Sequence, residues 1–142
     1  MISTPHPADA VRLPAPVRVL ALVLLFWVPF SLALEASAGL PRLVHYGVPA
    51  IALLLLRIGV AGLGVAAGRA LWAVQPSAVQ IAQAWLVLDI AVTALTLATP
   101  YFPSNRLPGA RRRDLAVAVA FNAAWFVYLR VSPRVKACWA RA

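Results

Sequence analysis

Cysteine, histidine and acidic residues are all scarce in this chain of 142 residues. It has one cysteine, Cys138, two histidines and four acidic side chains. A single cysteine excludes an intramolecular disulfide and a thiol-redox centre, which needs at least a pair. The histidines, His6 and His45, both lie outside the hydrophobic runs, so they cannot ligate a haem within a helical core. Because no nucleophile stands beside a recognisable base, we expect no enzyme, no metal site and no cofactor.

Charged residues of both signs are also few, and they make up 12% of the chain against 63% hydrophobic residues. A soluble domain of this size carries roughly twice that charged fraction. The hydrophobic runs fill most of the sequence, which leaves no room for a separate soluble domain. The composition therefore predicts a single integral membrane domain over residues 1–142.

Four hydrophobic runs are candidate membrane spans, which need about 20 apolar residues. The fourth, Leu115–Leu129, is short for a bilayer, and Arg113 and Arg130 can snorkel to extend it. The periodicity and length of the four runs predict an all-α membrane protein with four transmembrane helices in one antiparallel bundle. Residues 1–16 contain four prolines and predict a mobile leader, and residues 132–142 predict a basic interfacial tail. The expected spans are about 18–38, 48–69, 79–99 and 114–131.

The first hydrophobic run, Val19–Leu34, has two interpretations. Its basic flank and the small residues Ala36-Ser37-Ala38 are typical of a signal peptide with a cleavage site. Against this, the run exceeds the usual length of about 7–15 apolar residues, and further spans follow. We expect an uncleaved helix that is kinked at Pro29 and ends at Gly39-Leu40-Pro41-Arg42.

Two charged residues lie near the middle of the second and third spans. Arg57 stands within Val48–Arg69, and Asp89 stands within the run AWLVLDIAVTALTLA. An arginine at the bilayer centre costs about 2.5–3.5 kcal/mol even on a mild insertion scale, so it needs a partner or water. Because helices joined by a short loop run antiparallel, the two residues are expected at similar depth. We predict that Arg57 and Asp89 contact one another inside the bundle.

Small residues share a helix face with Arg57. Ala61, Gly64 and Gly68 follow it at helical spacing, and Gly64 with Gly68 forms a small-xxx-small pair. Such a groove lets another helix approach closely. Helix packing is therefore the expected role of these three residues.

Polar residues recur on the third and fourth spans. Thr93 and Thr96 follow Asp89 at helical spacing and extend a polar stripe, although threonines also bond to their own helix carbonyls. Asn122 is the one strongly polar residue inside the fourth run. An asparagine at such a position commonly forms a hydrogen bond between helices. With Arg57, these residues make the candidate intramembrane polar site.

The C-terminal region carries a local motif of the form W-x-x-Y-L-x-x-S-x-R-V-K. This segment resembles the ending of a bacterial family of four-helix membrane proteins known as domain-of-unknown-function family 2569. Cys138 and Trp139 replace the Thr-Phe pair that follows the motif in that family. The resemblance implies an inner-membrane protein, and it supplies neither an activity nor a catalytic residue. Its residues are Trp125, Tyr128, Leu129, Ser132, Arg134, Val135 and Lys136.

The net charge of +9 comes from basic residues that flank the hydrophobic runs. A nucleic-acid-binding protein gathers such residues on one polar face, so we expect anionic lipid headgroups as partners and no nucleic acid. The positive-inside rule favours cytoplasmic termini, because the first helix has its arginines on the N-terminal side and Glu35 beyond. We therefore expect an inner membrane protein with both termini inside.

Two functional hypotheses follow from these features. The first is a non-enzymatic bundle that assembles with itself or with a larger membrane complex, because small-residue grooves and polar residues between helices occur without recognisable chemistry. The alternative is a small transporter or ion pathway in which Arg57 and Asp89 form the gate or binding pair. Proton-coupled flux in vesicles separates the two hypotheses.

Overall fold

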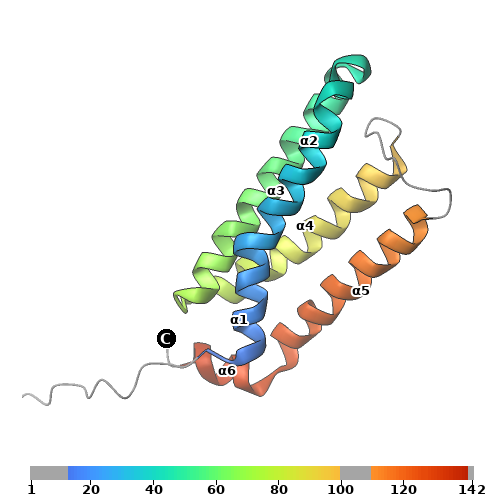
Figure 1. Cartoon of the computed structure of the whole chain (residues 1–142). Helices are drawn as coiled ribbons and strands as arrows, with labels where there is room; N and C mark the ends of the chain where they lie inside the picture. Colours follow the sequence, from blue (N-terminus) through green and yellow to red (C-terminus); the bar gives the residue numbers. More distant parts are fainter. Residues whose placement is uncertain (1–12, 100–109, 141–142) are drawn as a thin grey trace, which may run out of the picture.

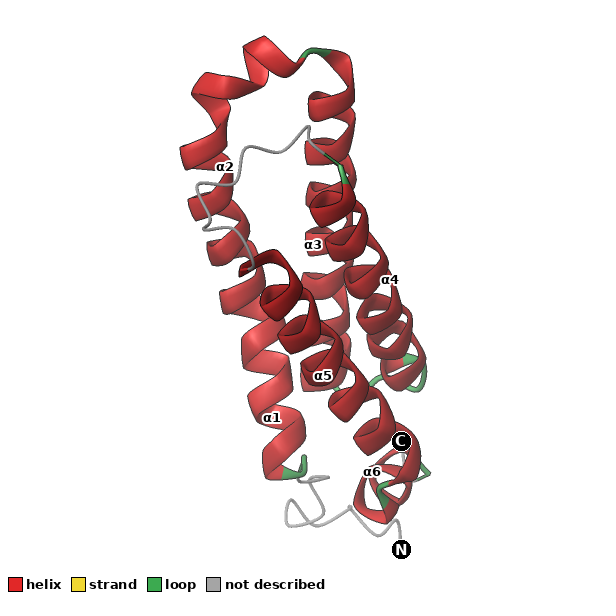
Figure 2. Cartoon of the chain, turned by 90° about the vertical axis from the view of Figure 1, so that its right-hand side faces the viewer, coloured by secondary structure: helices red, strands yellow, loops and turns green. Residues whose placement is uncertain are grey.

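The computed structural model describes residues 13–99 and 110–140, and it describes their side chains except at 38–44, 110 and 111. Within these residues every regular element is helical, as Figure 2 shows in red. Four helices are long and apolar enough to cross a membrane, at Ala15–Ser37, Val48–Trp72, Ala78–Ala98 and Arg112–Val131. This arrangement confirms the predicted all-α protein with four candidate spans. Residues 1–12 of the expected leader and residues 100–109, between the third and fourth spans, lie outside the described residues.

The first span is one helical rod with a π-helical interruption. It consists of α1 (Ala15–Leu22), the π-helix η2 (Val23–Trp27) and α2 (Val28–Tyr46). Pro29 has no N–H to donate, and its ring crowds the preceding turn. The wider π turn lies directly before Pro29, and the Val28 N–H donates to the Val23 carbonyl. The disturbance predicted at Pro29 therefore takes the form of a π-helical segment.

The first helix is longer at both ends than expected, although the candidate span within it, Ala15–Ser37, lies close to the predicted 18–38. The helix begins at Ala15, within the expected leader, because Pro16 falls in the first turn, where its missing N–H is not needed. The helix also continues through the expected break at 39–42 and ends at Tyr46. The chain reverses at Gly47, whose φ of +68° is cheap only for glycine. Glu35 thus lies inside a long helix, well before its end.

The remaining helices follow the predicted spans closely. Helix α3 (Val48–Trp72) and α4 (Ala78–Ala98) are joined by a short turn, and α5 (Ala110–Val131) completes the four. The continuous helix ends before Pro133, which begins α6 (Pro133–Trp139), a short helix that occupies most of the predicted tail. A proline at a first helical turn favours this restart.

The helices pack in chain order. Figure 1 shows α4 lying between α3 and α5, while α1, η2 and α2 lie along α3. Among the described spans, α5 makes its extensive contacts with α4 alone. The beginning of α1, the α3–α4 turn and α6 lie together at one end of the molecule (Figure 1). Backbone approach is therefore closest between helices that follow one another in the chain, while residues of all four spans contribute to one buried core.

Apolar side chains are divided between a small core and an exposed outer surface. The core includes Leu20, Leu24, Leu71, Leu86 and Leu129, which are almost fully buried. Every span also exposes large apolar side chains, and a soluble monomer rarely shows such surface over its whole length. This distribution fits a protein whose outer surface meets lipid. The exposed examples are Phe26, Trp27, Leu55, Val87 and Val117.

Candidate functional site

One polar residue from each span contributes to an intramembrane group that we call the polar cluster. Its members are Glu35 of α2, Arg57 of α3, Asp89 of α4 and Asn122 of α5. Gly47 lies near the sequence midpoint between Glu35 and Arg57, and the α3–α4 turn lies near the midpoint between Arg57 and Asp89. Because each α-helical residue rises by about 1.5 Å, such symmetric hairpins bring these residues to similar depth.

The guanidinium of Arg57 forms an ion pair with the carboxylate of Glu35. Sequence analysis predicted Asp89 as the partner of Arg57, and the structure gives Arg57 an ion pair with Glu35. The reason is the length of the first helix. Because α2 continues to Tyr46, Glu35 lies at the same depth in the bundle as Arg57. The sequence had predicted that Glu35 lies near the end of the first helix. Both side chains remain partly accessible, at 35% for Glu35 and 22% for Arg57.

Asp89 interacts with its neighbours in two ways. Its Oδ2 accepts a hydrogen bond of 2.9 Å from Nδ2 of Asn122, which joins α4 to α5. The positive charge of Arg57 attracts the carboxylate, and the negative charge of Glu35 repels it. The charge of Arg57 thus favours the carboxylate of Asp89, as the predicted pairing requires, and their direct contact stays a prediction.

Asn122 is the most enclosed member of the polar cluster, at 1% exposure. Its Nδ2 donates both to Asp89 and to the carbonyl of Ala118, each at 2.9 Å. The amide is thereby oriented, since both of its N–H groups face acceptors. Its Oδ1 is buried and accepts no hydrogen bond from the described residues. An amide oxygen left in this state costs free energy unless something else donates to it.

The threonines of the predicted stripe behave differently from Asp89. Thr96 donates to the carbonyl of Val92 at 2.7 Å, which is the bond to its own helix that was considered for it. Thr93 lies one helical turn beyond Asp89 and is half-buried. Only Thr93 therefore stands close enough in the helix to extend the polar cluster.

The small residues of α3 lie at two different contacts. Ala61, Gly64 and Gly68 are all buried. A Cβ at Gly64 would lie 2.6 Å from Nε1 of Trp85 on α4, and a Cβ at Gly68 would lie 2.9 Å from Cγ of Leu25 in η2. Trp85 also donates to the carbonyl of Val60 at 2.9 Å. The two glycines thus allow close approach of α3 to its neighbours on both sides.

The C-terminal motif spans the junction between α5 and α6. The rings of Trp125 and Tyr128 meet edge to face, with centroids 5.7 Å apart. Leu129 and Val135 are buried, while the basic side chains of the motif are exposed. Ser132 occupies the position before α6 without a capping hydrogen bond from its side chain. Sequence reasoning did not anticipate the docking of Trp139, whose Nε1 donates to the Gln75 carbonyl at 2.7 Å.

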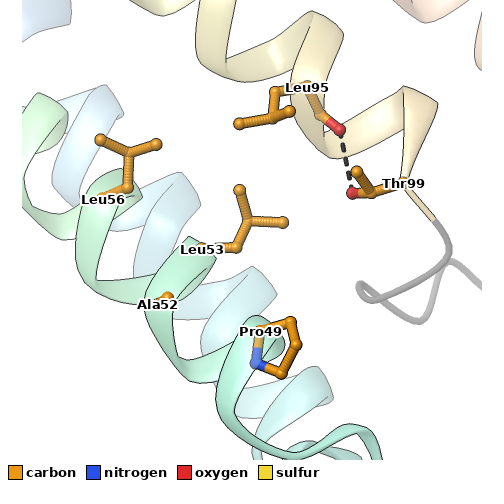
Figure 3. Close-up of a pocket in the computed structure, with 6 residues that line it drawn as sticks. All are labelled: Pro49, Ala52, Leu53, Leu56, Leu95 and Thr99. Atoms are coloured by element: carbon orange, nitrogen blue, oxygen red, sulfur yellow. Dashed lines mark hydrogen bonds between the residues drawn. The ribbon is translucent and has the colours of Figure 1, made fainter.

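A separate pocket of about 340 Å³ lies between the beginning of α3 and the end of α4 (Figure 3). Its lining is apolar except for Thr99, whose hydroxyl donates to the carbonyl of Leu95 at 2.9 Å. No member of the polar cluster lines it. The pocket therefore offers apolar volume without groups that could perform chemistry. It is lined by Pro49, Ala52, Leu53, Leu56, Leu95 and Thr99.

The polar cluster can hold charge, exchange a proton or bind a small cation, since carboxylates and an amide oxygen are its acceptors. Among the described residues, no group of three or more histidine, cysteine, aspartate or glutamate side chains could hold a metal ion. Comparisons with known protein families, curated proteins and solved structures find no match. The geometry of the polar cluster is therefore the evidence for what this site can do. It lies within a protein that has four candidate membrane spans.

Proposed function

We propose that this chain is a small, non-enzymatic protein of a bacterial inner membrane that works by assembling with further copies of itself. The accessible ion pair between α2 and α3 carries this proposal. The side chains of Glu35 and Arg57 remain 35% and 22% accessible. Polar groups within a membrane face a protein interior or water far more often than lipid. A further helix that covers this side would remove the polar groups from lipid.

The Glu35–Arg57 pair favours a second copy as the partner. It presents one acidic and one basic group side by side, and a surface with both signs is complementary to itself under two-fold rotation. Each carboxylate could then also face the guanidinium of the other copy. The alternative partner is a larger, unrelated membrane protein, which the composition of the purified complex would reveal.

Membrane location and orientation belong to the same proposal. The basic side chains of Arg18, Arg69, Arg130, Arg134 and Lys136 are exposed, and the helix ends that carry them gather at one end of the molecule (Figure 1). Basic residues close to a surface gain about 1 kcal/mol each from anionic lipid. We propose that this end faces the cytoplasm, with both termini. The resemblance to family 2569 stays part of the proposal.

Self-assembly is measured by counting subunits in native-membrane nanodiscs with a fluorophore on each chain. The proposal expects two or more bleaching steps for the wild type. Replacing both Glu35 and Arg57 by leucine should shift the distribution toward one step, because it removes the self-complementary pair. Arg69→Leu repeats the arginine half of this change at an exposed position of α3 and should leave the count unchanged. Single steps for the wild type would contradict self-assembly, and a different co-purifying chain would replace the second copy as partner.

An ion pathway is the second candidate, and the polar cluster favours it. One polar residue from each span meets the others at similar depth, and intramembrane ionisable groups commonly mark ion or proton routes. This candidate would be supported if the wild type carried protons or Na⁺ into proteoliposomes and the Asp89→Asn variant did not. Vesicles without flux above the protein-free background would leave assembly as the function.

A further inference from the structure

The polar cluster combines a carboxylate and an unused oxygen at one point. Asp89 accepts one hydrogen bond, from Asn122, and it is influenced by one positive neighbour, Arg57, and one negative neighbour, Glu35. The charges of these two neighbours act on Asp89 in opposite directions. An ionised carboxylate between membrane helices is costly unless positive charge or hydrogen-bond donors compensate it.

The amide oxygen of Asn122 lies in the same place. Its Oδ1 shares a carbon with Nδ2, the atom that donates to Oδ2 of Asp89 at 2.9 Å. Oδ1 therefore lies within one amide width of the Asp89 contact, is buried, and accepts nothing from the described residues. Turning the amide over would put the oxygen against the Ala118 carbonyl and the Asp89 carboxylate, which are both acceptors, so the observed orientation is held.

These oxygens suit a small cation with a single charge. Hard cations bind carboxylate, amide and hydroxyl oxygens, and Thr93 is placed one helical turn beyond Asp89 on α4. A divalent ion ordinarily uses several carboxylates, and the described residues contain no group of three or more metal-binding side chains. One positive charge would offset Asp89, and it would give Oδ1 of Asn122 an electrostatic partner.

We propose that Asp89 and Asn122 form a binding site for one small monovalent cation, either Na⁺ or a hydrated proton. Asp89 supplies the charge, and the buried oxygen of Asn122 completes the contact from the neighbouring helix. A cation bound at this site would connect α4 to α5, the described span on which α5 packs most closely being α4. The inference requires neither self-assembly nor transport, so it stands or falls separately from the proposed function.

The test is the thermal stability of the purified full-length protein in detergent. In one series NaCl replaces choline chloride at constant ionic strength and pH 8, and in the other the pH falls in choline chloride alone. We expect occupancy of the site to raise Tm by about 3–6 °C in a saturating manner, since a ligand stabilises the state that binds it. A response to NaCl identifies Na⁺, and a response to acid alone identifies the proton.

Three variants decide whether the response belongs to this site. Asp89→Asn resembles the neutral, occupied site, so it should fold and lose both the Na⁺ and the acid response. Asn122→Leu should lose the Na⁺ response or weaken it by at least about tenfold in midpoint concentration, since one oxygen contact is removed. Asp114→Asn makes the same change of charge outside the polar cluster and should keep the wild-type response. A wild type that responds to neither series, or an Asp89→Asn variant that responds like the wild type, would overturn the inference.

Discussion

Glu35 is the residue whose role changes most between sequence and structure. In the sequence it stands beyond the first hydrophobic run, where a charged residue ordinarily marks the end of a span. In the structure it pairs with Arg57 inside the bundle. Pairing lowers the free-energy cost of placing Glu35 and Arg57 in the membrane, because each side chain offsets the charge of the other. Asp89 then interacts with Asn122, and the polar cluster contains one direct ion pair and one hydrogen bond between helices.

The Glu35–Arg57 pair predicts a particular pattern in a double-mutant cycle. Arg57→Leu should cost about 3 kcal/mol in detergent, toward the lower end for a broken buried pair, because Glu35 is 35% exposed. Combining Arg57→Leu with Glu35→Leu should recover much of that loss. The coupling of Arg57→Leu with Asp89→Leu should be smaller, since the ion pair of Arg57 is with Glu35. Denaturant titration of the three single and two double variants measures both couplings, and a larger coupling for Asp89 than for Glu35 would support the pairing expected from sequence.

At the scale of elements, α3 is the helix on which the others are organised. Its buried glycines allow close contact with α4 through Trp85 and with η2 through Leu25. Without a strong hydrophobic force between helices in lipid, close packing and hydrogen bonds supply much of the association energy. The bond from Trp85 to the Val60 carbonyl adds a directional contact to this packing. Helix α5 contains no glycine, and the Asp89–Asn122 bond contributes to its attachment.

A comparison of two glycines tests the α3–α4 contact. Gly64→Ala introduces a Cβ 2.6 Å from Nε1 of Trp85, and forced overpacking of this kind typically costs about 1–3 kcal/mol. Gly62→Ala meets nothing within 4 Å on the same helix, and it gains up to about 1 kcal/mol in helix propensity. Tm should therefore fall for Gly64→Ala and stay level or rise for Gly62→Ala. Equal shifts for both would show that α3 and α4 do not meet in this way.

At the scale of the whole molecule, both described chain ends and the α3–α4 turn lie at one end (Figure 1). Helix α6 is held there by the bond from Trp139 to the Gln75 carbonyl. Cys138 of this helix is only 7% exposed, so the native thiol is a poor reporter of orientation. The helix through Ala38 is continuous, and retention of the first span remains a prediction that intact mass decides.

The orientation is best measured with introduced cysteines in a Cys138→Ala background. Ala140→Cys marks the end that we propose to be cytoplasmic, and Tyr46→Cys marks the opposite end of the first span. Both positions are exposed. A membrane-impermeant thiol reagent should label Tyr46→Cys in intact spheroplasts and Ala140→Cys only after lysis, because the basic end is retained in the cytoplasm. The reverse labelling pattern would invert the topology.

The sequence by itself determined the membrane class, the four spans and the polar residues at their centres. These follow from run length and from the cost of a charge in lipid, which are local properties of the chain. Spans two and three were accurate to a few residues, because their boundaries coincide with turn residues and with changes of composition. Arg57, Asp89 and Asn122 could be singled out for the same reason, since each interrupts an apolar run.

Only the tertiary structure decided which polar residues meet. The register of α2 against α3 depends on where the first helix ends, and the sequence predicted a break at 39–42. The helix in fact continues to Tyr46, and Glu35 pairs with Arg57. The accessibility of the Glu35–Arg57 pair and the unused oxygen of Asn122 likewise could not be predicted from local patterns. Both depend on how helices distant in the sequence approach one another, since a hydrogen bond or an ion pair forms only where two such surfaces coincide.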